Sequence, residues 1–305
     1  MQITLLLYPD FSNHCLANTL EPLRAANDLS GEPLFTWSVV SRDGAPVASS
    51  SGLRLQVDGA LAEARGDMLI AQPSYGFRGF ATPAGRAGLR AARTRFSTLA
   101  GFDTGAWLLA DAGLLDGYRA TVHWEELEDM AEAFPEVTAL RTRFLWDRDR
   151  LTCAGASAAF DAMGDLIERV GGPALRLEVA LLFVTPDVAA EPAAPMATSA
   201  VMAQVLGVMQ DNLEEPLPVG EIARRVGVSP RSLDRLAQRE LGSSPAQTYA
   251  RLRLLRARKL VRETRLSVAE IAVRSGYQDA SAFTRAFRQA FGHAPRMLRS
   301  GASGS

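Results

Sequence analysis

The residues with the clearest chemical potential lie in a short turn, Asp103-Thr104, between a strand-like run and a helix-like run. FSTLAGF (96–102) has the composition of a buried strand, and a helix is expected to begin near Trp107. A sharp elbow of this kind places one side chain at the top of a sheet, beside the free amides of a helix N-terminus that can hold a ligand carboxylate. That side chain is Asp103. An aspartate at this position is explained equally well by capping of the following helix and by contact with a ligand.

Further candidate ligand-binding side chains are expected at the same edge of a sheet. The loop QPSYGFR (72–78) follows the strand-like run DMLIAQ, and open α/β sheets bind ligands beyond the carboxyl ends of their strands. His123 and Trp124 follow a strand-like RATV. Glu21 interrupts an apolar helix start, where a buried carboxyl without a partner is costly. The candidate set is Glu21, Ser74, Tyr75, Asp103, Thr104, Trp107, His123 and Trp124.

These residue types are compatible with a cationic ligand. Asp103 and Glu21 supply negative charge, and aromatic rings such as Tyr75, Trp107 and Trp124 offer π faces to a cation. Taken singly, His123 and the tryptophans fit a core or an interface as well as a pocket.

A second group of candidates comes from an internal repeat near the end of the chain. Residues 218–245 and 267–295 share an Ile-Ala pair followed by glycine, Gly227 in the first copy and Gly276 in the second, at an offset of 49. Later positions match at an offset of 50. A small alanine lets two helices approach closely, and glycine permits the tight turn between them. Each copy therefore predicts a helix-turn-helix, with Ser229 and Asp279 as N-caps of the second helices.

The predicted second helices carry side chains that suit DNA. Arginine binds guanine edges or phosphates, and serine and threonine are adaptable hydrogen-bonding groups. A solvated helix face or a phosphate contact accounts for any single arginine as well as base recognition does. The candidate DNA-binding residues are Ser229, Pro230, Arg231, Ser232, Asp234, Arg235, Ala280, Ser281, Thr284, Arg285 and Arg288.

One long helix is expected between the two copies. Residues 245–263 have helical spacing, with Pro245 in the first turn. At 1.5 Å per residue such a helix is roughly 27 Å long. It would hold two recognition helices about one DNA turn, roughly 34 Å, apart.

The elements before the repeat predict a different fold class. Strand-like runs at 3–8, 35–41, 67–72 and 96–102 alternate with helical patterns at 15–30 and 82–94. This alternation predicts a parallel α/β sheet flanked by helices over residues 1–185. A segment rich in proline and alanine (186–197) is expected to be a linker, 198–300 an all-α DNA-binding domain, and 301–305 a disordered tail.

Charge and composition limit the function classes. Residues 198–300 hold 17 Lys and Arg against 9 Asp and Glu, whereas residues 1–197 hold 16 against 25, which indicates a polyanion-binding module joined to an acidic one. No run approaches the roughly 20 apolar residues of a membrane span, and no signal peptide is apparent. Cys15 and Cys153 have no metal-ligand spacing, so we expect no metal and no cofactor, in a reducing cytoplasm.

The C-terminal third resembles the AraC/XylS family of transcription regulators. The two turns, the connecting RLRLLRARKLV helix and the closing FRQAFGHAPRMLR carry the resemblance. The closing family motif usually reads Pro-x-x-Tyr-Arg, where this chain has Leu298. Ala237 stands where the family often has phenylalanine, which predicts a looser first unit.

Residues 2–185 resemble the class I glutamine amidotransferase-like (PfpI-like) superfamily, on the elbow AGFDTGAWLLA, the Glu21-Pro22 pair and His123-Trp124. Its enzymes carry a nucleophilic cysteine at the elbow, where this chain has Asp103, and a glycine-rich loop where it has Pro73 and Tyr75. A carboxylate is a poor nucleophile for acyl transfer, so no catalytic residue is expected. The combination resembles the GlxA-type regulators. Within them DTGAWLLADAGLLDGYRATVHWE and EPLRAANDLSGEPL resemble members that sense amino acids and quaternary amines.

Three functions follow from these observations. The first is a regulator, an activator by family resemblance, in which a small effector bound by the α/β domain controls how a homodimer engages promoter DNA and RNA polymerase. The second is an amidase or hydrolase tethered to DNA. The third is a constitutive regulator whose α/β domain only dimerises.

Overall fold

A mostly parallel sheet organises the first part of the computed structural model, which describes residues 1–183 and 199–301. In these residues the strand order is β10-β11-β7-β6-β1-β2-β5, and β10 runs antiparallel to β11 at one edge. The parallel strands are apolar because both faces of the sheet are covered. The strands are β1 (Gln2–Leu7), β2 (Thr36–Ser41), β5 (Gly59–Ala60), β6 (Gly66–Gln72), β7 (Phe96–Phe102), β10 (Phe144–Asp147) and β11 (Arg150–Cys153).

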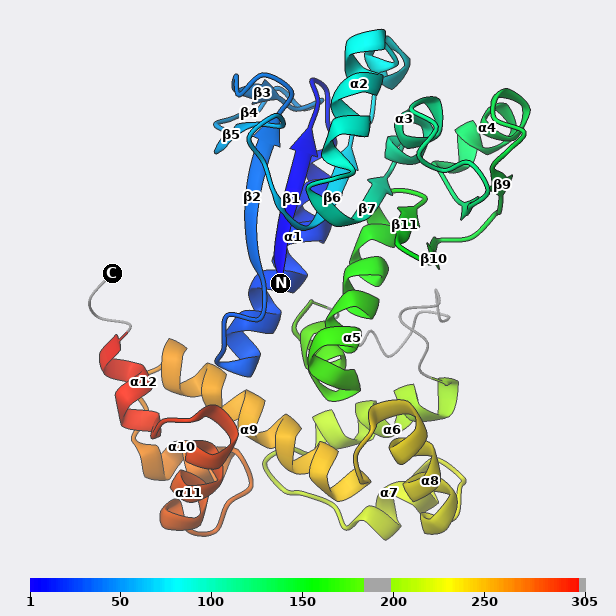
Figure 1. Ribbon diagram of the computed structural model, residues 1–305. Coiled ribbons are helices and arrows are strands. Elements are labelled where there is room, and N and C mark those ends of the chain that lie inside the picture. The colour runs from blue at the N-terminus through cyan, green and yellow to red at the C-terminus, as the bar shows by residue number, and fades with distance from the viewer. Residues whose placement is uncertain (184–198, 302–305) are drawn as a thin grey trace. The chain divides into compact units, whose positions relative to one another are not determined.

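Helices cover both faces of this sheet (Figure 1). The step from β1 to β2 moves toward one edge and the step from β6 to β7 toward the other, so right-handed crossovers place α1 and α2 on opposite faces. The expected α/β class and its four main strands are confirmed. The remaining elements are α1 (Asn13–Ser30), β3 (Val47–Ala48), β4 (Arg54–Leu55), η1 (Phe77–Phe80), α2 (Pro83–Ala92), α3 (Gly105–Asp111), β8 (Arg119–Ala120), η2 (Trp124–Glu126), α4 (Leu127–Ala133), β9 (Thr138–Ala139) and α5 (Ala156–Phe183).

The described residues from 199 onward are helical, as the repeat predicts. Figure 1 shows α6, α7 and α8 around one end of α9 and α10, α11 and α12 around the other. Gly227 and Gly276 have φ angles of 71° and 72°, the left-handed conformation that the two turns require. The helices are α6 (Ala200–Asp211), α7 (Val219–Arg225), α8 (Pro230–Leu241), α9 (Pro245–Glu263), α10 (Val268–Arg274), α11 (Ala280–Phe291) and α12 (Pro295–Gly301).

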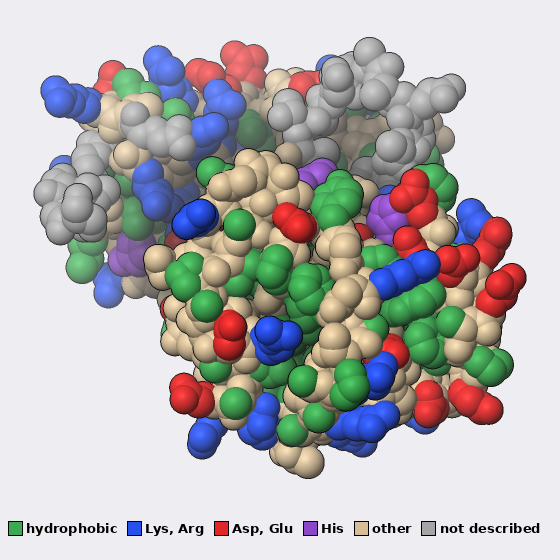
Figure 2. Space-filling view, turned by 90° about the horizontal axis from the view of Figure 1, so that it is seen from above, with side chains coloured by type: hydrophobic (Ala, Val, Ile, Leu, Met, Phe, Trp, Pro, Cys, Tyr) green, Lys and Arg blue, Asp and Glu red, His purple; other side chains and the backbone are tan. Residues whose placement is uncertain are grey.

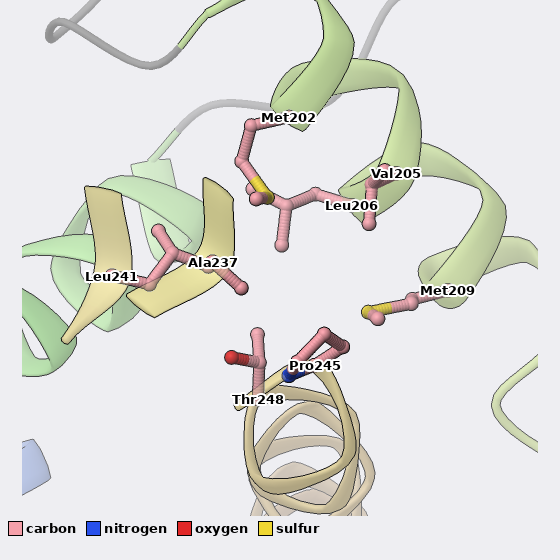
Figure 3. A pocket seen from close by; sticks show the side chains of 8 residues that line it. All are labelled: Met202, Val205, Leu206, Met209, Ala237, Leu241, Pro245 and Thr248. Atoms are coloured by element: carbon pink, nitrogen blue, oxygen red, sulfur yellow. The ribbon is translucent and has the colours of Figure 1, made fainter. Parts of the chain in front are cut away.

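The two helix-turn-helix units have separate cores of different composition. In the second unit Phe283, Phe287 and Phe291 stack along α11, with ring centroids 5.6 and 4.7 Å apart. In the first unit Ala237 occupies the position of Phe287, and the side chains of Met202 and Met209 approach it instead (Figure 3). The gap between them has no room for a water molecule. Flexible methionines therefore border the space that a phenylalanine would take, and the looser first unit expected from Ala237 stays a prediction.

Contacts divide the chain inside α5. One unit comprises Met1–Asn27 and Pro33–Leu166, and the other comprises Asp28–Glu32 and the chain from Ile167 onward. The helix is interrupted at Gly172, whose φ of 85° and ψ of 168° are not helical. The linker expected at 186–197 and the tail expected at 301–305 lie outside the described residues, apart from Gly301 at the end of α12. Among the described helices, none is long and apolar enough to cross a membrane.

Candidate nucleic-acid interface and ligand site

Helix α8 is amphipathic, and its outward face carries the candidate DNA-binding residues. Its inward face buries Leu233, Ala237 and Leu241. Ser229 caps the helix by accepting a hydrogen bond from the amide of Ser232. The remaining candidates point away from the core: Pro230, Arg231, Asp234 and Arg235 are exposed and Ser232 is half-buried.

Helix α11 repeats this arrangement with different side chains. Asp279 caps it by accepting hydrogen bonds from the amides of Ser281 and Ala282. Thr284 donates to the carbonyl of Ala280 over 2.7 Å, which leaves its methyl group and both lone pairs of its hydroxyl oxygen for other contacts. Ser281, Arg285 and Arg288 are exposed, and Ala280 and Thr284 are half-buried.

The arginines on these two outward faces differ from their neighbours on the same module. Arg224 and Arg225 pair with Glu221, and Arg239 pairs with Glu240. By contrast, within the described part of the chain no ion pair holds the exposed candidates Arg231, Arg235, Arg285 and Arg288. Their guanidinium groups are therefore available to phosphates or base edges.

A groove beside α11 contains two residues that the sequence did not single out. It is lined by the first turns of α10, α11 and α12, and includes Arg285 together with Ser267 and Arg296. The first copy has Ala246 at the position equivalent to Arg296 and Asp234 at the position equivalent to Thr284. This difference between copies was a visible signal for a more cationic second unit.

Side chains of α9 fix the position of both units. In the first unit the Tyr249 hydroxyl donates to the carbonyl of Asn212 over 2.6 Å. In the second, Arg253 donates to the turn carbonyls of Ser275 and Gly276, and its guanidinium lies 4.4 Å from the ring centre of Tyr277. The connecting helix thus holds the loop between α6 and α7 in the first unit and the turn before the recognition helix α11 in the second.

The elbow of the α/β domain has the geometry expected from its sequence. Asp103 follows β7 with a φ of 58°, and its side chain is 8% exposed. Its carboxylate accepts a hydrogen bond from the Ser74 hydroxyl over 2.7 Å, and Ser74 accepts one from the amide of Ser12. The N-cap of α3 is Thr104, so Asp103 does not cap this helix. Through Ser74, the loops that follow β1, β6 and β7, neighbours in the sheet, are joined at this elbow.

Burial dominates the protonation of the groups around the elbow. It raises the pKa of Asp103, although the Ser74 hydrogen bond and the charge of His123 oppose the shift. Burial also raises the pKa of Cys153 to about 12 and the pKa of Cys15 well above its usual value, and the negative charge of Asp103 adds to both shifts. Both cysteines are therefore protonated thiols at neutral pH, and neither supplies a thiolate nucleophile.

Several expected ligand-binding residues lie near this elbow, and two of them, Tyr75 and Trp124, are exposed to solvent. The amide of His123 donates to the carbonyl of Asp103 over 3.0 Å, and the Thr104 hydroxyl donates to the carbonyl of Ser74. Tyr75, next to Ser74, is 67% exposed, and Trp124, next to His123, is 62% exposed.

Trp107 is placed differently from the sequence expectation. It is buried against Phe77 and Phe134, with ring centroids 5.5 and 5.2 Å away. The guanidinium of Arg78 lies 4.6 Å from its ring centre, so a cation of the protein already occupies this π face. Arg78 also pairs with Glu126 and Asp129, which ties the loop of Ser74 and Tyr75 to the segment that follows Trp124.

Glu21 is not in the buried position that its apolar neighbours suggested. Its side chain is 49% exposed and pairs with Arg24 over 2.8 Å, one turn along α1. The desolvation argument for a role of Glu21 therefore does not apply. In the described residues no cluster of three or more His, Cys, Asp or Glu side chains is arranged to hold a metal ion.

Comparisons with known proteins agree with this two-part architecture. Residues 222–301 match the family described as a helix-turn-helix domain. The HTH-type transcriptional regulator CdhR of Pseudomonas aeruginosa is 37% identical over 96% of this chain and 90% of its own length. The HTH-type transcriptional regulator GlxA of Rhizobium meliloti is 36% identical over 98% of this chain and 95% of its own length.

Solved structures show the fold of the α/β domain. A ThiJ/PfpI family protein from Pseudomonas syringae matches with a TM-score of 0.53 at 20% identity, over 82% of this chain and 90% of its own. An AraC family transcriptional regulator from Pseudomonas putida matches with a TM-score of 0.52 at 26% identity, over 60% of this chain and 99% of its own. The chain therefore belongs to the AraC family of helix-turn-helix, DNA-binding transcription regulators, of the GlxA type with a PfpI-like α/β domain.

Proposed function

We propose that this protein activates transcription when a small cationic metabolite, an amino acid or a quaternary amine, binds at the Asp103 elbow. The observation that carries the proposal is the Asp103 carboxylate, held in a left-handed conformation where three loops meet and bonded to Ser74. Among the described residues Ser74 is the side chain that donates to this buried carboxylate, and a cation beside it would stabilise its charge further.

The surroundings of the elbow favour a positively charged ligand. Figure 2 looks onto the strand ends of the α/β domain and shows acidic side chains gathered on its right, over α4. This acidic segment follows directly on Trp124 and comprises Glu125, Glu126, Glu128, Asp129 and Glu132. Arg78 and Arg141 offset part of this charge by pairing with Glu126, Asp129 and Glu128. The negative charge that remains attracts a cation over about a Debye length, roughly 8 Å at physiological salt. Tyr75 and Trp124 add exposed aromatic faces, which bind quaternary ammonium groups well.

The elbow chemistry favours sensing over hydrolysis. Asp103 stands where the PfpI-like enzymes place their nucleophile, and Cys15 and Cys153 are buried thiols with raised pKa values. A hydrolase would need a nucleophile activated by a neighbouring base. Amidase activity that is lost in Asp103→Ala would support an enzyme instead.

Differential scanning fluorimetry of the full-length protein tests the effector site. We expect amino acids, betaines or carnitine to raise the melting temperature saturably, because stabilisation grows as RT ln(1 + [L]/Kd). Asp103→Asn should abolish the shift. Asp67→Asn should retain it, since Asp67 lies at the opposite end of β6 and bonds the Gln2 amide. No shift with any of these compounds would instead favour a constitutive regulator whose α/β domain only dimerises.

The proposed setting is a cytoplasmic homodimer that binds promoter DNA and contacts RNA polymerase. Analytical ultracentrifugation measures the oligomeric state. Transcription in vitro from a bound promoter, with and without the stabilising compound, measures activation. A fall in transcript on adding the compound would reverse the sign of regulation proposed here.

A further inference from the structure

The second half of α5, residues 173–183, packs against the DNA-binding helices. Beyond the break at Gly172, it belongs by its contacts to the same unit as both helix-turn-helix motifs. Leu177 and Leu181 pack against the core of the first motif. Pro173 lies so close to the C-cap of α8 that a Cβ on Gly242 would be 2.9 Å from its ring. We call residues 173–183 the docking segment.

The docking segment also holds the second motif, through a buried ion pair. Glu178 is 6% exposed, and both of its carboxylate oxygens accept hydrogen bonds from Arg251 of α9, one of them over 2.7 Å. The same guanidinium donates to the carbonyl of Ala290 over 3.1 Å and lies 4.7 Å from the ring centre of Phe291. Glu178 thereby orients the arginine that holds the C-terminal end of α11.

Together these contacts link the ends of the two recognition helices. Pro173 abuts the end of α8, and Glu178 acts through Arg251 on the end of α11. A bidentate carboxylate–guanidinium pair has a fixed geometry, unlike a single hydrogen bond. A protein that reads two successive major grooves depends on this spacing, because they recur every 34 Å along DNA.

We propose that the docking segment, through Glu178 and Arg251, sets the spacing of the two recognition helices and so determines which separation of DNA half-sites the protein accepts. Glu178 is a positioning residue. The proposal rests on DNA recognition by both motifs and is independent of the effector. The second half of α5, the helix that follows the last strand of the sheet, would thus contribute directly to DNA specificity.

The test uses full-length protein and a duplex selected by the wild type from a random-sequence pool. A footprint of the wild type on this duplex identifies the two DNA segments that the two motifs protect. In two further duplexes the separation between these segments is one base pair longer or one base pair shorter. The quantity measured is the ratio of affinities for the selected and the altered spacing. In Glu178→Gln we expect this ratio to fall by about fivefold or more, because the altered spacings are now tolerated.

Glu168→Gln is the matched control. Glu168 lies before the break at Gly172 and pairs with Arg176 on α5 itself. Among the described residues it forms no hydrogen bond or ion pair with either motif, so the ratio should stay at the wild-type value. Arg251→Lys keeps the charge but loses the bidentate guanidinium geometry, so it should lower the ratio as Glu178→Gln does. This second variant tests the proposal even if Glu178→Gln folds poorly. An unchanged ratio, or an equal loss of affinity at every spacing, in a folded variant would overturn the proposal. A wild type that selected no duplex would overturn DNA recognition and the spacing role together.

Discussion

Arg285 and Arg235 occupy equivalent positions in the two copies of the repeat, but their neighbours differ. Thr284 precedes Arg285, whereas the acidic Asp234 precedes Arg235. A carboxylate near an arginine weakens its attraction to phosphate and to guanine, and the charge of Asp279 also acts on Arg285. We therefore expect any stronger binding by the second motif to come from its additional arginine, Arg296, and not from Arg285 alone.

Replacing Arg285 with alanine is expected to relax specificity at one base step. If this guanidinium reads a base, the discrimination lost is about 1–3 kcal/mol at that position. Competition binding against a library of single-base substitutions measures it. Arg239→Ala is the control, since Arg239 pairs with Glu240 near the far end of α8 and should leave the preferences unchanged. Equal weakening on every sequence would make Arg285 a phosphate contact.

The buried carboxyl of Asp103 predicts a pH dependence of stability. Because burial raises its pKa, the folded state holds this proton more tightly than the unfolded state. Stability from this group is therefore present at low pH and falls as pH rises from the unfolded value of about 3.9 through the raised folded value. Asp103→Asn removes the titration, and asparagine tolerates the left-handed backbone of this position.

The melting temperature of Asp103→Asn should rise relative to that of the wild type as pH increases above the unfolded pKa of about 3.9. Thermal unfolding of both proteins in parallel buffers gives this difference. Groups that do not interact with Asp103 cancel in the comparison. A difference that stays constant across the range would mean that the carboxyl titrates as it does in the unfolded chain.

At the scale of elements, the two motifs solve the same packing problem differently. Phe287 on α11 is fully buried in the phenylalanine stack. Ala237 on α8 faces the methionine side chains of α6 (Figure 3). We expect Phe287→Ala to lower the free energy of unfolding by about 3–5 kcal/mol, because it leaves a cavity. The exchange Ala237→Phe should also destabilise, by about 1–3 kcal/mol, because the gap has no room for water and must open.

Urea denaturation measured on both variants distinguishes these effects. The control is Val273→Ala on α10, where the side chain is 60% exposed and little packing is lost. Stabilisation by Ala237→Phe would show that the methionines yield easily and that the first motif is underpacked.

Local signals in the sequence predicted the helical half almost completely. Gly227, Gly276, Ser229 and Asp279 act through the backbone of their own turn, so their roles follow from neighbours in the sequence. The elbow at Asp103 was predictable for the same reason.

Features that depend on distant partners were not predictable. The exposure of Glu21 depends on how α1 lies on the sheet, and the occupied face of Trp107 depends on Arg78, which comes from another loop. The exposure of Glu21 and the occupied face of Trp107 are set by tertiary packing that leaves no local pattern. The break at Gly172 is different, because Gly171-Gly172-Pro173 is a local helix-breaking sequence that we did not use as a prediction.

At the scale of the whole molecule, charge is divided between the two functional parts of the chain. The acidic excess lies in residues 1–197 and the basic excess in residues 198–300. The part that binds a polyanion is therefore cationic even though the chain as a whole carries a formal charge of −1. DNA affinity should consequently depend steeply on salt, since each phosphate contact releases counterions.

The groove beside α11 should contribute measurably to this salt dependence. Arg296 and Arg285 both line it, whereas the first motif has Ala246 in place of Arg296. A phosphate contact by Arg296 predicts that Arg296→Ala lowers the slope of log K against log salt by about 0.9. It should also weaken binding about equally on all sequences.

Fluorescence anisotropy at several salt concentrations, on a specific and a random duplex, measures both quantities. Arg224→Ala, an exposed arginine already paired with Glu221, should change the slope less. If Arg296→Ala instead changed affinity on one duplex only and left the slope intact, the groove would recognise bases and the second motif would read DNA from two helices.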